Sequence, residues 1–284
     1  MTAAGIFLTH RRTPRIRRHF QRLVAESRSL VRWHWVYSHD PGPRPTARFA
    51  TEDPAEVLGA RNRAMEEHGG VQGGYLDTLM MPLLRGLRAD HLWVCEYDVD
   101  YAGSWHDFFT RYADHEADLL TTHLMYRSEH PEWTHWQRAA SPEWVPQELW
   151  VRSLNPLMRV STRLVNSYCA AMADEGWQGH YEFTLPTAAL AAGLSIEDLG
   201  GHTSFTLEER RGSGYIGKTP EGRPPDMTFG FRPVRRYYFE ERPETFDQQG
   251  LLYHPVKPGI RAWSRATRNV PRLPHPVRGG DVAG

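Results

Sequence analysis

Three carboxylates stand at alternate positions in residues 96–100, directly after the apolar run HLWVC of residues 91–95. In an extended segment alternate side chains point to the same side, so Glu96, Asp98 and Asp100 are expected to share one face. Carboxylates crowded in this way repel one another, and a bound divalent cation removes the conflict. Their hard oxygens select Mg²⁺ or Mn²⁺. The spacing therefore indicates a metal site at a strand end, although an acidic turn facing solvent explains it equally well.

The segment WVCEYDVDYAG, residues 93–103, resembles the strand and D-x-D element of GT-A-type glycosyltransferases, which use nucleotide sugars. It is also similar to an uncharacterised glycosyltransferase-like family with the pattern W-x-x-E-Y-D-x-x-Y-x-G. The match is sharp over residues 75–105 and more diffuse over residues 5–260. It implies that Asp98 and Asp100 bind a Mn²⁺ or Mg²⁺ ion that bridges the donor diphosphate, with Asp100 as the direct ligand. It assigns no role to Glu96.

The resemblance also implies a carboxylate near the acceptor. In GWQGHYEFTLPTAALAAGL, residues 176–194, Glu182 stands ahead of a helix that we expect to begin at Pro186. A carboxylate there could take the proton from an attacking hydroxyl as general base. The usual pair in the family is Glu-Asp, whereas Phe183 follows Glu182 here, and a helix-capping or solvated glutamate is the alternative.

A histidine late in the chain is the last element that the resemblance implies. In LLYHPVKPG, residues 251–259, an apolar run leads into His254, which would complete the metal shell. Lys257 follows three residues later and would meet a phosphate of the donor. Because the chain has 15 histidines, an ordinary surface or core histidine explains His254 about as well.

Basic residues follow the first apolar run of the chain. We expect the donor diphosphate to be contacted there by Thr9, His10, Arg11 and Arg12. Arginine side chains suit this task because their forked donors match diphosphate oxygens. The alternative is the solvated basic start of a helix. Asp40 ends the next expected strand and could hydrogen-bond the base or ribose.

The elements that must position these residues follow from hydrophobic periodicity. A strand over 4–10, a helix over 14–29 that begins at Pro14, and a strand over 30–40 form a βαβ unit. The continuous hydrophobicity of 91–95 is typical of a central parallel strand covered on both faces. Further helices are expected within 53–69, 73–90, 104–115 and 186–194, a strand within 117–126, and a strand followed by a helix within 157–176.

This pattern predicts an α/β fold: a GT-A-like, Rossmann-like, mostly parallel sheet flanked by helices, with an irregular acceptor-side region. We expect one domain over residues 1–264, made of a nucleotide-binding half over 1–105 and an acceptor-side half over 106–264, and a flexible tail over 265–284. Residues 128–150 form the irregular excursion and hold Trp133, Trp136, Trp144 and Trp150. These rings could stack on sugars as an acceptor platform, but anchoring of the loop to the core is the favoured interpretation.

The string GSGYIGKT, residues 212–219, fits the phosphate-binding loop of many NTPases. That loop needs a buried strand before it and a helix after it, so that backbone amides face the phosphate. Here TLEERR precedes the string and PEGRPPD follows it, and neither fits. We therefore interpret 212–226 as a loop that could fold over a bound donor.

Composition restricts the remaining classes. The chain has 284 residues, 40% of them hydrophobic, and its 34 Lys and Arg balance its 34 Asp and Glu. This balance gives no global bias toward nucleic acid or an anionic membrane. Two cysteines do not make a disulfide framework, and no run approaches the ~20 apolar residues of a membrane span. The first apolar run also precedes the basic cluster, the reverse of a signal peptide, so we expect a cytoplasmic protein.

The predicted activity is metal-dependent transfer of a sugar from a nucleoside-diphosphate sugar to a small-molecule or glycan acceptor with a free hydroxyl. If Glu182 is the base, the acceptor attacks directly and the anomeric centre inverts. The alternatives are a non-catalytic nucleotide- or glycan-binding protein on the same scaffold and, less favoured, a P-loop phosphotransferase.

Overall fold

The computed structural model describes residues 3–37, 74–173, 176–218, 222–232 and 243–257. Three expectations lie outside these residues: Asp40, the helix within 53–69 and the tail over 265–284.

The chain begins with the expected βαβ unit. Strand β1 (Ala3–Thr9) and strand β2 (Val31–Tyr37) are parallel neighbours, joined by helix α1 (Pro14–Ser27). The helix begins where the sequence indicates, because the hydroxyl of Thr13 accepts from the amide of Ile16 at 3.3 Å and Pro14 occupies the first turn.

The main sheet has six strands in the order β2-β1-β3-β6-β5-β7. The four strands not yet placed are β3 (His91–Glu96), β5 (Leu119–Tyr126), β6 (Val151–Ser161) and β7 (Ile196–Asp198). β1 and β3 are parallel, as are β5 and β7, whereas β6 runs antiparallel to both of its neighbours. The prediction of an α/β fold with a mostly parallel sheet flanked by helices is therefore confirmed.

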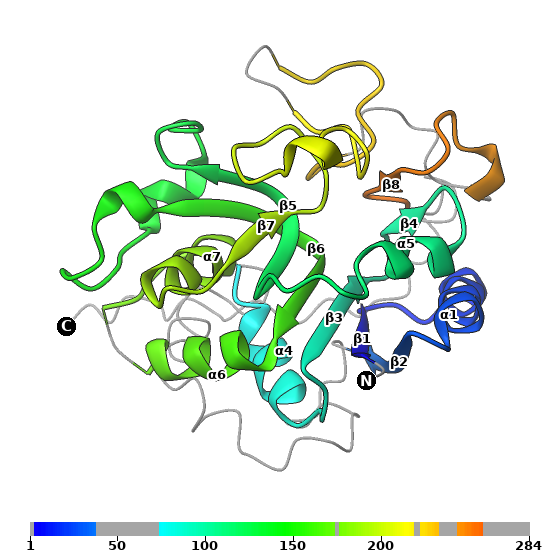
Figure 1. The fold of residues 1–284 in the computed structure, drawn as a ribbon, viewed down its shortest axis with the longest axis horizontal. Helices are drawn as coiled ribbons and strands as arrows, with labels where there is room; N and C mark the ends of the chain where they lie inside the picture. Colours follow the sequence, from blue (N-terminus) through cyan, green and yellow to red (C-terminus); the bar gives the residue numbers. More distant parts are fainter. Residues whose placement is uncertain (1–2, 38–73, 174–175, 219–221, 233–242, 258–284) are drawn as a thin grey trace, which may run out of the picture.

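Helices cover both faces of the sheet (Figure 1). One face carries α4 (Asp77–Arg85), α6 (Thr162–Ala171) and α7 (Tyr181–Ala191), and the other carries α1 and α5 (Trp105–Arg111). Successive residues of β1 enter different cores: Ile6 packs in the α4–α6–α7 core, and Phe7 packs in the core next to α1 and α5. Burial on both faces explains why β1 and β3 are continuously apolar.

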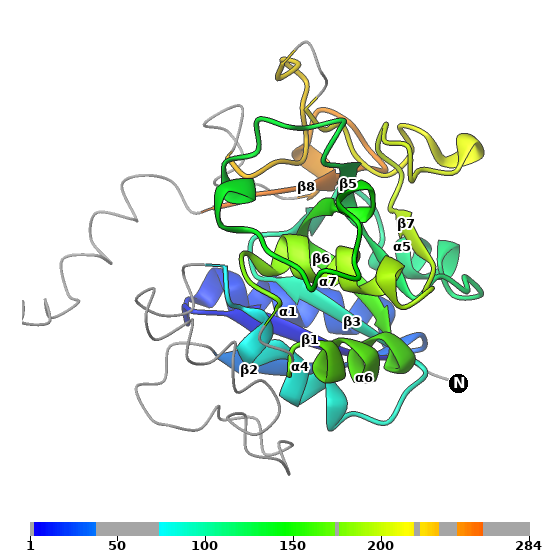
Figure 2. The ribbon, with the colours of Figure 1, turned by 90° about the vertical axis from the view of Figure 1, so that its left-hand side faces the viewer.

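A small second sheet joins the end of the chain to the acidic segment. Strand β4 (Asp100–Tyr101) pairs antiparallel with strand β8 (Leu252–Tyr253). In both views β8 and the loop that follows β7 lie on the side of the molecule opposite α4 and α6 (Figures 1 and 2). The segment between β5 and β6 contains two short 3₁₀ turns, Thr134–Arg138 and Gln147–Leu149, as expected of an irregular excursion.

Candidate metal centre and its surroundings

Glu96, Asp98 and His254 form a group that could bind a metal ion. One ligand atom from each residue lies within 4.8 Å of the others. Glu96 is the last residue of β3, Asp98 is in the turn after it, and His254 follows β8. Two carboxylates and one imidazole suit Mn²⁺ or another hard or borderline divalent cation.

Backbone pairing holds His254 against this turn. Asp100 is registered with Tyr253 in the β4–β8 pair, and the amide of Val256 donates to the carbonyl of Asp98 at 2.7 Å. The ring of His254 is oriented by the carbonyl of Gly230, which lies 2.8 Å from Nδ1. Since that carbonyl can only accept, Nδ1 carries the proton and Nε2 presents its lone pair. An imidazole held in this way by a backbone carbonyl is the usual arrangement of a metal-binding histidine.

The side chain of Asp98 fits a cation. Its Oδ1 atom is buried and has no hydrogen-bond donor among the described residues, and it lies 3.7 Å from Nε2 of His254. Its Oδ2 atom lies 3.4 Å from Nζ of Lys257. A buried carboxylate oxygen without a donor is costly unless another positive partner binds it. The residues present therefore fit a divalent ion, and Lys257 lies beside the group as expected.

Burial and mutual repulsion act on the acids of this region. Burial and the charge of Asp98 raise the pKa of Glu96 to about 8, with a further contribution from Glu182. Burial lowers the pKa of His254, although Asp98 acts in the opposite direction. His254 is therefore neutral at pH 7, the state in which it can bind a metal.

Asp100 lies outside this group, which differs from the expectation that it is the direct ligand. Its Oδ1 atom accepts from Nη1 of Arg22 at 2.7 Å and from the amide of Tyr101 at 2.8 Å. The physical reason is that β3 ends at Glu96 and residues 97–99 turn, with the amide of Val99 donating to the carbonyl of Glu96 at 3.1 Å. Alternation of side chains therefore stops before Asp100, whose carboxylate ties α1 to β4.

Glu182 lies at the same edge of the sheet as the metal group. Its carbonyl accepts from Ser153 near the start of β6, and the antiparallel pairing of β3 and β6 places the end of β3 at that edge. Glu182 is in the first turn of α7, which begins at Tyr181 rather than at Pro186 because the ring of His180 caps the helix by accepting from the amide of Glu182. Pro186 inside the helix has no amide proton to offer the carbonyl of Glu182. The hydroxyl of Ser153 donates to that carbonyl at 3.0 Å and fixes the turn to β6.

The environment of the Glu182 carboxyl favours a proton near neutral pH. Burial raises its pKa to about 7, whereas the charge of Arg152 and the backbone amide of Asn155 act in the opposite direction. A carboxyl that changes its protonation near pH 7 is suited to act as a general base.

The residues after β1 lie near the turn but satisfy one another. The hydroxyl of Thr9 donates to the carbonyl of Arg11 at 2.7 Å, and Nε of Arg11 donates to the ring of His10 at 3.1 Å. The ring of His10 packs edge-on against Tyr97 of the 97–99 turn, at 4.9 Å between ring centroids. Arg12 stacks on the ring of Tyr37 at 4.1 Å. The strand order thus brings these residues to the edge where β3 ends, and diphosphate contact by them stays a prediction.

The tryptophans mainly anchor the excursion. Trp136 and Trp150 are buried and stack at 6.1 Å, and both rings contact Phe183 of α7. Trp133 is partly buried beside Trp136, and Trp144 is exposed.

The GSGYIGKT string lacks the context of a phosphate-binding loop. A 3₁₀ turn, Glu208–Arg210, precedes it, and no helix follows in residues 222–232, the next described stretch. Nζ of Lys218 lies 3.1 Å from Oε1 of Glu132 and 3.3 Å from Nε2 of His130.

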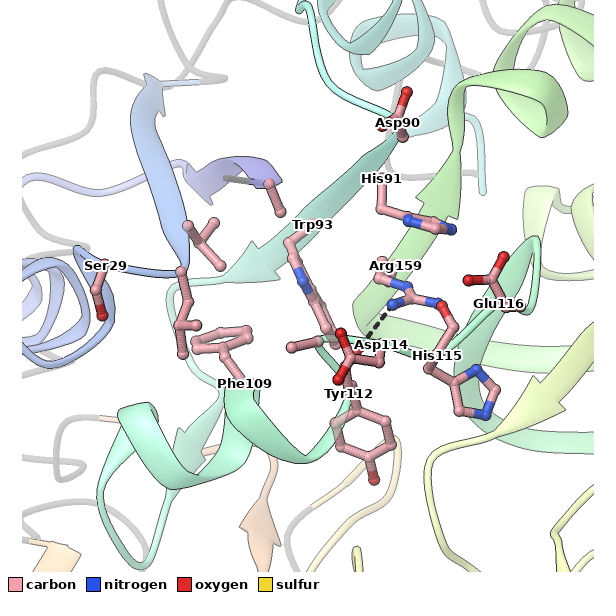
Figure 3. Close-up of a pocket in the computed structure, with 14 residues that line it drawn as sticks. Ser29, Asp90, His91, Trp93, Phe109, Tyr112, Asp114, His115, Glu116 and Arg159 are labelled. Atoms are coloured by element: carbon pink, nitrogen blue, oxygen red, sulfur yellow. Dashed lines mark hydrogen bonds between the residues drawn. The ribbon is translucent and has the colours of Figure 1, made fainter. Parts of the chain in front are cut away.

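A separate hollow of about 670 Å³ opens at the opposite edge of the sheet, where β1, β2 and β3 begin (Figure 3). His91, Trp93 and Arg159 line it. It shares no residue with the metal group, so it does not belong to that centre.

Sequence reasoning assigned no role to Glu96 and did not single out Arg152. The signal for Glu96 was its position at the end of the buried strand. No comparable signal marks Arg152, whose surroundings come from segments far apart in the chain.

No protein-family model matches this chain, and no match was found among curated proteins. Within the described ranges, no helix has both the length and the apolar character needed to cross a membrane.

Proposed function

We propose that this chain is a metal-dependent, GT-A-type glycosyltransferase that moves a sugar from a nucleoside-diphosphate sugar to an acceptor hydroxyl. The observation that carries the proposal is the joint location of the Glu96–Asp98–His254 group and the carboxyl of Glu182 at one edge of the sheet. The D-x-D resemblance of residues 93–103 and the mostly parallel sheet support the same assignment.

Each residue of the centre has a role in this proposal. Glu96, Asp98 and His254 hold a Mn²⁺ or Mg²⁺ ion, which when bound neutralises the charge that develops on the diphosphate leaving group. Lys257, 3.4 Å from Asp98, adds a second positive charge for a phosphate oxygen.

Glu182 takes the proton from the acceptor hydroxyl in this proposal. Its pKa of about 7 leaves a large fraction of the carboxyl ionised at neutral pH and still basic enough to accept a proton. Attack by the acceptor oxygen then breaks the bond between the sugar and the diphosphate, with the proton on Glu182 and inversion at the anomeric carbon.

The test is release of nucleoside diphosphate from UDP- and GDP-sugars in the presence of Mn²⁺ and an acceptor panel. Metal-dependent release that Glu182→Gln abolishes supports the proposal. Stabilisation by UDP or GDP with Mn²⁺ but without turnover would instead favour a nucleotide-binding protein on this scaffold. Phosphoryl transfer from ATP, lost in Lys218→Ala, would favour a phosphotransferase.

A further inference from the structure

Arg152 is a buried cation beside Glu182 that no carboxylate contacts directly within the described part of the chain. It is the second residue of β6 and is 8% exposed. Nη1 donates to Nδ1 of His130 at 3.2 Å, and Nη2 donates to the carbonyl of Ser153 at 3.1 Å. The Nε–H group has no acceptor in the described residues. A buried guanidinium in this state is costly, and an anionic partner would relieve the cost.

Arg159, on the same strand, shows what a structural arginine of this sheet contacts. Its guanidinium donates to the carbonyls of Tyr112 at 2.7 Å and Ala117 at 3.2 Å, and to that of His115. Tyr112 is the residue that caps the C-terminus of α5, and Figure 3 shows Arg159 beside Tyr112 and His115. The Nη groups of Arg159 thus have three carbonyl acceptors, although its Nε atom also lacks an acceptor among the described residues, whereas the Nη groups of Arg152 have one carbonyl and one imidazole nitrogen.

A second cation lies next to Arg152. Nζ of Lys218 is 3.3 Å from Nε2 of His130. Because Nδ1 of this ring accepts from Arg152, Nε2 carries the proton and faces Oε1 of Glu132 at 3.0 Å. The guanidinium of Arg152 packs over the ring of Trp133 at 5.3 Å, which fixes its plane. Glu132 pairs with Lys218, but the side chain of this glutamate is 63% exposed. Solvent therefore screens the negative charge that Glu132 places beside Lys218 and Arg152.

Two more buried polar atoms have no hydrogen-bond partner among the described residues. They are Nε2 of His123 and, on the same strand as Arg152, Nδ2 of Asn155. His123 is in β5 and has a φ of 56°, a costly backbone conformation for a residue other than glycine. Its ring lies 6.0 Å from the ring of Phe229, which in turn lies 5.1 Å from the ring of His254. His123 is therefore linked to the metal group through one aromatic ring.

We propose that Arg152 and Lys218 form a subsite for an oxyanion, a carboxylate or phosphate, carried by the acceptor. The inference rests on the proposed transfer reaction and names the acceptor class: a hydroxyl compound with a negative group close to the attacking oxygen. The acceptor rather than the donor is assigned because Ser153, the neighbour of Arg152 in β6, donates to the carbonyl of Glu182 at 3.0 Å, whereas the donor diphosphate belongs beside Asp98 and Lys257.

Anion binding can be measured without any transfer. In metal-free and nucleotide-free buffer, the melting temperature is followed during titration with glucuronate and with inorganic phosphate, against NaCl of equal ionic strength and against glucose. We expect both anions, but not glucose or NaCl, to raise the melting temperature of the wild type. Arg152→Gln and Lys218→Gln should lose most of this rise. In the glucuronate titration, Lys257→Gln, the donor-side control, should keep the rise.

The variants separate the possible results. Lys218 is partly exposed, so Lys218→Gln tests the subsite even if the buried Arg152→Gln variant does not fold. An unchanged rise in Lys218→Gln, or a rise lost only in Lys257→Gln, overturns the subsite. With an active enzyme, methyl glucuronide should have a KM roughly tenfold or more below that of methyl glucoside, a gap that Arg152→Gln closes. Equal KM values would overturn the acceptor class while leaving the transfer reaction intact, and absence of transfer would overturn the proposed function instead.

Discussion

The Oδ1 atom of Asp98 lies 3.7 Å from Nε2 of His254, although the two residues are far apart in the sequence. The β4–β8 pair brings them together, and the Gly230 carbonyl turns the imidazole so that its lone pair is available. This relationship separates the metal group from the neighbouring carboxylate of Asp100, which pairs with Arg22.

Asp98→Asn and Asp100→Asn should therefore have different effects. Asp98→Asn should weaken Mn²⁺ binding by roughly tenfold or more with little change in stability. Asp100→Asn weakens the 2.7 Å contact with Arg22 and should lower the free energy of unfolding by about 1–3 kcal/mol while the metal group persists. Chemical denaturation and Mn²⁺ titration of both variants check this. Loss of Mn²⁺ binding in a folded Asp100→Asn variant would return Asp100 to the ligand set.

The pH profile of transfer should report Glu182. Because its folded pKa is about 7 and the base must be ionised, kcat should rise as pH increases through about 7. Glu182→Gln should lower kcat by roughly 10²–10⁴-fold and remove this rise. Arg152→Gln removes a charge that lowers the pKa of Glu182, so its profile should move to higher pH. A flat wild-type profile between pH 5.5 and 8.5 would argue against Glu182 as the base.

Asp118 should stabilise the fold at all but acidic pH. Although burial acts to raise it, hydrogen bonds from Arg163, Ser161 and Ser195 hold the pKa of Asp118 at about 2, below its ordinary value of 3.8. The folded state thus binds its proton less tightly than the unfolded state, so the stabilisation is complete above pH 4 and is lost as pH falls toward 2. Asp118→Asn should flatten this dependence and destabilise the protein by about 1–3 kcal/mol at pH 7. Urea denaturation at pH 7 and pH 3 measures both effects, with a variant of the exposed residue Asp107 of α5, Asp107→Asn, as the control.

Local signals were sufficient for much of the fold. The start of α1 at Pro14 and the apolar runs of β1 and β3 are properties of short segments, and the structure contains them as predicted. The sequence predicts the start of α7 too late, at Pro186, because proline favours the first turn of a helix. Pro186 is tolerated inside α7 since Ser153, distant in sequence, satisfies the carbonyl of Glu182.

The site was predicted less completely than the fold. Alternation along 96–100 presupposed a continuous strand, and the turn at 97–99 breaks it, so Glu96 joins Asp98 in place of Asp100. The group that includes Arg152, His130 and Lys218 depends on how two segments pack against β6. His130 is in the segment between β5 and β6, and Lys218 is in the segment that follows β7. Hydrophobic periodicity contains no information on such contacts.

Mn²⁺ titration of the metal-free protein, followed by calorimetry or by the loss of the free-ion paramagnetic resonance signal, tests the central claim most directly. We predict that the wild type binds one ion per chain, that UDP or GDP tightens the binding, and that Asp98→Asn and His254→Ala each weaken it by roughly tenfold or more. Two results would contradict the claim that this group binds a metal ion. The wild type could take up no Mn²⁺ in the presence of either nucleotide, or the wild type and Asp98→Asn could bind Mn²⁺ with equal affinity.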